Sequence, residues 1–266
     1  MLRLYVLLIF TLISSASGLA KKRMELAENL AVLVYPEVKI ISEELLKICP
    51  PEDCVLVGVG RSPTPILAHL EALYPKSVLN LPLSADGAII ALREEEKFEK
   101  YFQRKVIDKI PKNKKQILLF DYVRYGRSFY YAGEFLASRF EDQGFKIKTA
   151  GMHNSVGEVA IDPMSGNFQH LIDHLIPIDD MTILHFLRSK SFDDFADYET
   201  FNFVGKDGPQ RNLTGKDKEF KYYMRKQLLE DEDYLKKLGV NKAIIESKGE
   251  KFSFKNCLRL LLSFLK

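Results

Sequence analysis

Two segments of the chain combine an apolar run with a polar loop whose residue types suit phosphate binding. The first is 54–65, where the apolar run ends in Gly60, Arg61, Ser62 and Thr64. Glycine lets the backbone approach a ligand closely, a guanidinium can bind phosphate through two parallel hydrogen bonds, and hydroxyls can donate to its oxygens. The alternative is a tight turn in which the hydroxyls only cap the following helix. Because capping requires neither an arginine nor a second glycine, the composition favours anion binding.

The second segment, 116–128, has the same organisation. Its apolar run ends at Asp121, and a short loop then leads into an amphipathic stretch. An acid at the end of a buried strand usually has a function, so Asp121 is the candidate catalytic residue. Backbone amides at the start of the next helix would add positive charge for an anion. The predicted phosphate-binding residues of the two loops are Arg61, Ser62, Arg124, Tyr125, Gly126, Arg127 and Ser128.

Together the two loops resemble those of the type I phosphoribosyltransferases. In that family a loop after an early strand holds pyrophosphate, and a later strand ends in acids followed by a loop that holds the ribose 5-phosphate. Here Arg61-Ser62 matches the first loop, 117–121 the later strand and 125–128 the phosphate loop, and 87–112 has the length of the family's flexible hood. The resemblance covers about residues 50–180. It implies a small phosphorylated ligand, Asp121 at the ribose hydroxyls, and Mg²⁺ bridging the pyrophosphate.

The class of function stays open between three alternatives. Asp121, Gly126 and Ser128 favour an active transferase that catalyses phosphoribosyl transfer. Tyr122 stands where the family has a second acid, and the N-terminus predicts export away from a cytoplasmic sugar donor. Both features favour a non-catalytic binding module or regulator of the same fold. The third alternative is a phosphosugar-binding domain similar to sugar isomerase (SIS) domains. Residues 57–62 also resemble the opening loop of those domains.

The order of apolar segments predicts the scaffold that positions these loops. Continuous apolar runs, typical of buried parallel strands, alternate with segments of helical periodicity. Strands are expected at 55–59, 77–83, 117–121 and 146–152, and 171–178 is either a fifth strand or a short helix. Helices are expected at 24–48, with a break at Pro36 left open, and at 64–74, 94–110 and 129–143, where Gly144 ends the last. We predict an α/β fold with a Rossmann-like, mainly parallel sheet of the phosphoribosyltransferase-like type, with both loops at one sheet edge.

The N-terminus predicts export. Arg3 precedes an apolar stretch at 4–13 that is too short to span a bilayer comfortably, and Gly18-Leu-Ala20 suits a cleavage site before Lys21. We expect a periplasmic or secreted protein without stable membrane insertion once the signal is removed, and an uncleaved anchor is the alternative. The expected domains are a signal peptide at 1–20, the α/β domain at 21–180 and a C-terminal extension at 181–266, aromatic-rich and then helical at 217–238.

Composition indicates which partners to expect, and cysteine spacing bears on whether the chain has a disulfide. Because 39 Lys and Arg are interleaved with 36 Asp and Glu, giving a net charge of +3, no nucleic-acid partner is expected. The basic run 112–115 is expected to be a solvated turn. In an oxidising compartment Cys49 and Cys54 could form a disulfide, and two buried free thiols are the alternative.

The histidines add two weaker candidates. His170 and His174, four residues apart, could share a helix face as a metal pair, but no third ligand is evident. No protein-held metal site is therefore predicted. His153 follows the fourth expected strand and should lie at the carboxyl edge if the sheet is parallel.

Overall fold

The computed structural model describes residues 2–60, 62–81, 95–123, 127–154, 171–178, 198–200, 210–212 and 217–247. Its helices are α1 (Leu2–Ile48), α2 (Thr64–Leu73), α4 (Glu95–Lys105), α5 (Arg127–Phe140), α7 (Asp217–Glu230), α8 (Glu232–Lys237) and α9 (Lys242–Ser247), with a 3-10 turn η1 at Ile107–Lys109. Its strands are β1 (Cys54–Val59), β2 (Val78–Leu81), β3 (Gln116–Tyr122), β4 (Lys146–Asn154), β5 (His174–Ile178), β6 (Tyr198–Thr200) and β7 (Gln210–Asn212).

Five of the strands form one parallel sheet. Their order is β2-β1-β3-β4-β5, while β6 and β7 form a separate antiparallel pair. Gly58 of β1 lies between Asn80 of β2 and Phe120 of β3 in the register of the sheet. The prediction of a mainly parallel α/β sheet is thus confirmed, and residues 174–178 are a strand rather than a helix. β2 lies on one side of β1 and β3 on the other, so the strand order reverses between β1 and β3.

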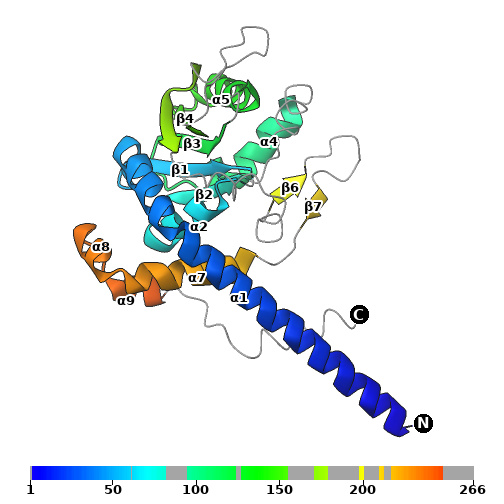
Figure 1. Ribbon diagram of the computed structural model, residues 1–266. Helices are drawn as coiled ribbons and strands as arrows, with labels where there is room; N and C mark the ends of the chain where they lie inside the picture. Colours follow the sequence, from blue (N-terminus) through cyan, green and yellow to red (C-terminus); the bar gives the residue numbers. More distant parts are fainter. Residues whose placement is uncertain are drawn as a thin grey trace.

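Helices cover both faces of the sheet (Figure 1). Successive side chains of β1 point to opposite faces of the sheet. Leu56 belongs to one buried cluster, whereas Val55 and Val57 belong to another. The first cluster includes residues of α1, α2, α7, α8 and α9, and we call it the long-range layer because it joins helices from both halves of the chain. The second includes residues of α4 and α5, and we call it the crossover layer. Burial on both faces accounts for the continuous apolar sequence of β1 and β3.

Helix α1 is longer than predicted. It runs without interruption from Leu2 to Ile48 rather than starting at residue 24, and its N-terminal half projects away from the sheet (Figure 1). Pro36 lies inside it, on the exposed side. The carbonyl that loses its donor to the proline belongs to the exposed Val32, where water can satisfy it, so no break results. Among the described residues, no helix is long and apolar enough to cross a membrane.

The ends of the other predicted helices differ for local reasons. The helix expected at 94–110 is divided into α4 and η1. Gly144, with φ of 78°, ends the turn after α5 as predicted, because its N–H donates to Glu141 O and the next N–H, that of Phe145, donates to Phe140 O. These two bonds form a Schellman motif, which favours glycine at the left-handed position.

A disulfide closes the turn between α1 and β1. Cys49 and Cys54 are bonded, with their Cα atoms 5.3 Å apart, and both are buried. Of the two alternatives that the sequence left open, the structure has the disulfide. The bond ties the end of α1 to the first strand at the amino edge of the sheet.

A buried lysine supports the same turn. The Nζ of Lys114 donates to the carbonyl oxygens of Pro51 and Cys54 and to Oγ of Ser77. Lys114 is 7% exposed, so the expectation of a solvated turn at 112–115 is wrong for this residue, although Lys112 is exposed. Burial lowers the pKa of the Lys114 ammonium, and two acids of the turn oppose this shift. Local sequence could not show that three oxygens of distant segments converge on this side chain.

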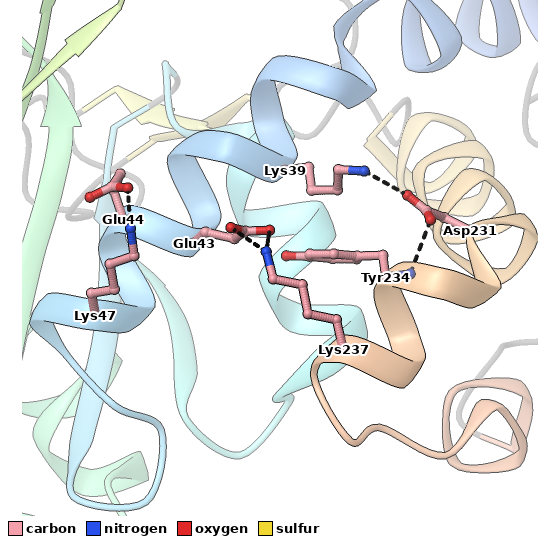
Figure 2. Close-up of polar contacts among 7 residues, drawn as sticks. All are labelled: Lys39, Glu43, Glu44, Lys47, Asp231, Tyr234 and Lys237. Atoms are coloured by element: carbon pink, nitrogen blue, oxygen red, sulfur yellow. Dashed lines mark hydrogen bonds and ion pairs between the residues drawn. The ribbon is translucent and has the colours of Figure 1, made fainter.

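The helix predicted at 217–238 is divided into α7 and α8 by Asp231. Its Oδ1 accepts a hydrogen bond from the backbone N–H of Tyr234 at 3.1 Å, which caps α8 (Figure 2). Its Oδ2 accepts from Lys39 of α1 at 2.9 Å and from the Tyr35 hydroxyl at 3.2 Å. Desolvation alone would raise the pKa of Asp231, but these hydrogen bonds and the Lys39 charge hold it below its usual range.

His69 of α2 lies fully buried beside this contact. Its Nδ1 is 3.0 Å from Oγ of Ser42, and its ring stacks on Tyr234 with centroids 5.7 Å apart. Its Nε2 is buried without a hydrogen-bond partner among the described residues. Burial, with a further contribution from the Lys39 charge, lowers the pKa of His69 to about 3. The imidazole is therefore neutral at pH 7.

Candidate functional site

The carboxyl ends of β1 and β3 lie side by side in the middle of the sheet. β1 ends at Val59 and β3 at Tyr122, and their pairing is parallel. The helix that follows β1 packs in the long-range layer, whereas the helix that follows β3 packs in the crossover layer. Where connections diverge from neighbouring parallel strands in this way, open α/β sheets bind their ligands. The two predicted loops therefore leave from the same sheet edge.

Only part of the predicted site is described. Asp121 and Ser62 are described with their surroundings, and the backbones of Arg127 and Ser128 are described as the first residues of α5. The remaining predicted residues, Arg61, Arg124, Tyr125 and Gly126, lie outside the described residues.

Gly60 makes the turn out of β1. Its φ of 79° lies in the left-handed region that favours glycine, and its N–H still donates to Leu81 O at 2.8 Å. Ser62 is half-buried, and Pro63 occupies the N-cap position of α2 without a side-chain hydrogen bond. The N-cap side chain therefore caps no amide of α2, and Pro65 contributes no N–H to its first turn.

Gly58, the second glycine of this segment, packs closely against α2. A Cβ at this position would lie 2.6, 2.7 and 2.8 Å from three side-chain atoms of Leu67 on α2. These distances are shorter than van der Waals contact, so a larger residue would push α2 away from β1. Of the two glycines, Gly60 is therefore the one that shapes the loop.

Asp121 lies half-buried at the carboxyl end of β3, as predicted. Its Oδ1 accepts a hydrogen bond from the backbone N–H of Tyr122 at 2.7 Å. By the alternation of side chains along a strand, Asp121 shares the face of Leu119, which belongs to the crossover layer. Tyr122 points to the other face and packs against the core of the long-range layer. Tyr122 therefore has a packing role in the structure.

The start of α5 brings the next predicted residues to the same edge. The helix begins at Arg127, two residues before the predicted start at Phe129. Arg127 and Ser128 therefore belong to the first helical turn, whose backbone N–H groups lack intrahelical acceptors. This is the arrangement expected of a phosphate-binding helix start.

Asn80 is a polar residue near this edge that the sequence analysis missed. It lies in β2, in register with Gly58, and its buried Oδ1 has no hydrogen-bond partner among the described residues. A single asparagine within an apolar run carries no motif, so no sequence signal could have identified it. His153 lies in β4, one residue beyond Met152, which pairs with Tyr122. Its expected position at the carboxyl edge is confirmed.

The described residues contain no group of three His, Cys, Asp or Glu side chains that could hold a metal ion. His174 is the first residue of β5, so it does not lie on the helix that the possible pair of His170 and His174 required, and His170 lies outside the described residues. In phosphate sites Mg²⁺ is held by one or two carboxylates together with substrate phosphates and waters. Among the described residues at the ends of β1 and β3, Asp121 is the single carboxylate. The residues therefore fit a Mg²⁺ ion that arrives with its ligand.

Comparisons with known proteins assign no family to this chain. No family model, no curated protein and no solved structure matches it. The fold is therefore described by its own topology, a five-stranded parallel α/β sheet whose strand order reverses between β1 and β3.

Proposed function

We propose that this protein binds a phosphorylated ribose or a nucleotide at the carboxyl ends of β1 and β3. The observation that carries the proposal is the divergence of α2 and α5 from these neighbouring parallel strands, with Asp121 at the end of β3. The turn at Gly60 and the start of α2 without an N-cap hydrogen bond support it. The arginines, hydroxyls and glycine of residues 61–62 and 124–128 supply the chemistry for the phosphate groups.

The proposal gives each part of the ligand a different partner. The phosphates would be held by the two loops and by the first-turn amides of α2 and α5. The Asp121 carboxylate would accept hydrogen bonds from ribose hydroxyls, and a Mg²⁺ ion held between the phosphates would offset their charge.

Phosphoribosyl transfer and non-catalytic binding are the two candidate activities. Asp121 supports transfer, because it could orient the ribose for attack. Tyr122 supports binding alone, since its side chain is turned into the core and offers no second acid. A panel of nucleobases incubated with phosphoribosyl pyrophosphate separates the two activities. Release of pyrophosphate that disappears in Asp121→Ala establishes the transferase, and binding without release establishes the module.

Calorimetric titration with phosphoribosyl pyrophosphate, ribose 5-phosphate and nucleotides, with and without Mg²⁺, tests binding itself. We expect heat with at least one ligand and an affinity that falls about 10- to 100-fold in Asp121→Asn, because a hydrogen bond to a charged group is lost. Asp142→Asn is the matched control, since Asp142 is exposed in the turn after α5, at the opposite sheet edge. No heat with any ligand, or equal losses in both variants, would contradict the proposal.

We also propose that the protein is exported by a signal peptide at residues 1–20. The Cys49–Cys54 disulfide supports an oxidising compartment, periplasmic or extracellular. N-terminal sequencing of protein from its native host should find a start at Lys21 or within a few residues of it. An intact Met1 in a cytoplasmic fraction would contradict export and remove the main objection to a transferase that needs a cytoplasmic donor.

A further inference from the structure

Helix α1 exposes large apolar side chains on the face that turns away from the sheet. Leu26, Val32, Leu33 and Ile40 are exposed by 50%, 50%, 56% and 54%. The opposite face of α1 is buried against α2 and α7 in the long-range layer. An amphipathic helix that covers a domain normally presents polar residues to water. We therefore expect these exposed apolar side chains to be covered by a partner.

Three of these residues lie on one line along the helix. Leu26, Leu33 and Ile40 follow one another at intervals of seven residues, and we call them the α1 stripe. Helices that pack lengthwise repeat apolar residues at two positions of each seven; the stripe supplies one of them, and Asn29 and Pro36 occupy the other. Val32 is equally exposed but lies about 100° around the helix from Leu33. The stripe therefore suits a helical partner, and Val32 provides a control position outside it.

A second copy of α1, running antiparallel, would bury the α1 stripe. When the two helices cross at Leu33, this residue meets its own counterpart, and Leu26 of each copy meets Ile40 of the other. Because the stripe faces away from α2 and α7, the remainder of each copy lies on the far side of its own helix. The same patch on both copies then forms one closed, two-fold interface.

The polar residues beside the stripe are complementary in the same alignment. Asn29 and Glu37, four residues before and after Leu33, come together, so that the amide of one copy can donate to the carboxylate of the other.

A parallel alignment lacks this complementarity. Glu37 and Glu44, each four residues after a stripe residue, would then lie beside the same acids of the other copy. Like charges beside a helical seam are unfavourable. We propose that the α1 stripe forms an antiparallel homodimer of this chain, centred on Leu33. All pairing residues lie beyond residue 20, so the dimer is independent of signal cleavage and of the proposed ligand.

Disulfide trapping tests both the partner and its direction. In a Cys257→Ser background, where Cys49 and Cys54 are already bonded, Leu33→Cys should cross-link to itself under mild oxidation. Leu26→Cys and Ile40→Cys should each remain monomeric alone and form a cross-linked heterodimer when mixed. Val32→Cys, equally exposed, should not cross-link. A Leu33→Cys yield no higher than that of Val32→Cys would overturn the dimer, and self-linking of Leu26→Cys would overturn its direction.

Sedimentation of the unmodified chain gives the second readout. The wild-type protein and Val32→Glu should be dimers, whereas Leu33→Glu should be a monomer with unchanged circular dichroism. A wild-type monomer, or a Leu33→Glu dimer, contradicts the proposal. A monomer in which Leu33→Cys resists a thiol reagent that modifies Val32→Cys would show that another segment of this chain covers the stripe instead.

Discussion

The helices of the two layers of this protein are joined to one another in different ways. In the long-range layer, ion pairs join α7 and α8 to α1 and α2 across 150–198 residues of sequence. These pairs are Lys226–Glu28 at 2.7 Å, Lys221–Glu71 at 2.8 Å, and Lys237–Glu43 and Lys39–Asp231 at 2.9 Å. In the crossover layer, α4 and α5 contact each other through tilted aromatic rings, as in Phe102–Phe140 and Phe98–Phe135, whose centroids are 5.2 and 5.6 Å apart, and through one longer ion pair, Arg139–Glu99 at 3.9 Å.

The difference follows from how each layer is connected. α5 is a direct crossover between β3 and β4, so its position is set by the chain itself and apolar packing suffices. α7 and α8 return to the first helix from far along the sequence, where many apolar surfaces could compete for them. Directional polar contacts can select one docking position, although each stabilises it only slightly. The candidate site depends on both layers, because α2 starts in one and α5 in the other.

The largest effect is expected in the crossover layer. Phe102→Ala removes a fully buried ring that packs on Phe140, which should lower the free energy of unfolding by about 3–5 kcal/mol. Because no charge is involved, the loss should be the same at all pH values where the protein folds. Urea unfolding measures it, with the exposed Tyr222→Ala as a control expected to cost about 1 kcal/mol or less. Equal losses in the two variants would contradict an apolar basis for this layer.

Acidification should weaken the long-range layer through His69. The pKa of His69 is about 3 in the folded protein and 6.5 in the unfolded chain, so below pH 6.5 the unfolded chain binds the extra proton. The stability of the neutral, buried state is thus fully present above pH 6.5 and falls as the pH decreases. Linkage gives a loss of about 2 kcal/mol between pH 6.5 and 5, where most carboxylates stay ionised.

Urea unfolding across this pH range separates the contribution of His69 from that of other titrating groups. His69→Gln, which does not titrate, should show a smaller decrease between pH 6.5 and 5 than the wild type. Phe102→Ala should keep the full wild-type slope, because its layer contains no part of this contact. Parallel curves for the wild type and His69→Gln would mean that a different group is responsible.

Gly58→Ala should disturb the contact between β1 and α2. The added methyl group would lie within 2.8 Å of Leu67 atoms, and overpacking of this kind costs about 1–3 kcal/mol. If the steric account is correct, Leu67→Ala should relieve part of that cost, which a double-mutant cycle of unfolding free energies detects. Additive losses in the two variants would contradict it.

Much of the fold was predictable because the local pattern of apolar residues indicates where strands and helices lie. Apolar runs such as 55–59 and 117–121 are buried on both faces, and their alternation with helical patterns predicted the parallel sheet. Gly144 was correctly assigned because a left-handed helix end favours glycine in any context. Lys114 and the division at Asp231 were not predictable, since each depends on partners from distant segments. A basic run looks the same whether its lysines face water or a cluster of carbonyls.

The candidate site was predictable to the same extent. Asp121 could be placed at a strand end because β3 has a clear apolar pattern, and parallel pairing then sets it beside the end of β1. The packing role of Gly58 was hidden, because it depends on how closely Leu67 approaches. Asn80 was hidden as well, since its importance comes from a buried oxygen without a donor among the described residues.

The smallest effect is expected for the exposed ion pair between Lys237 and Glu43 (Figure 2). The two oxygens of Glu43 each lie 2.9 Å from the Lys237 ammonium, but the lysine side chain is 63% exposed. A double-mutant cycle with alanine should give a coupling of about 0.2–1 kcal/mol, and salt should screen it. If such contacts mainly select the docking position, replacing Lys221, Lys226 and Lys237 together should accelerate amide hydrogen exchange in α7 and α8 well before it changes global unfolding. Faster exchange throughout the sheet would instead show that these pairs support the whole fold, and the contrast between the two layers would disappear.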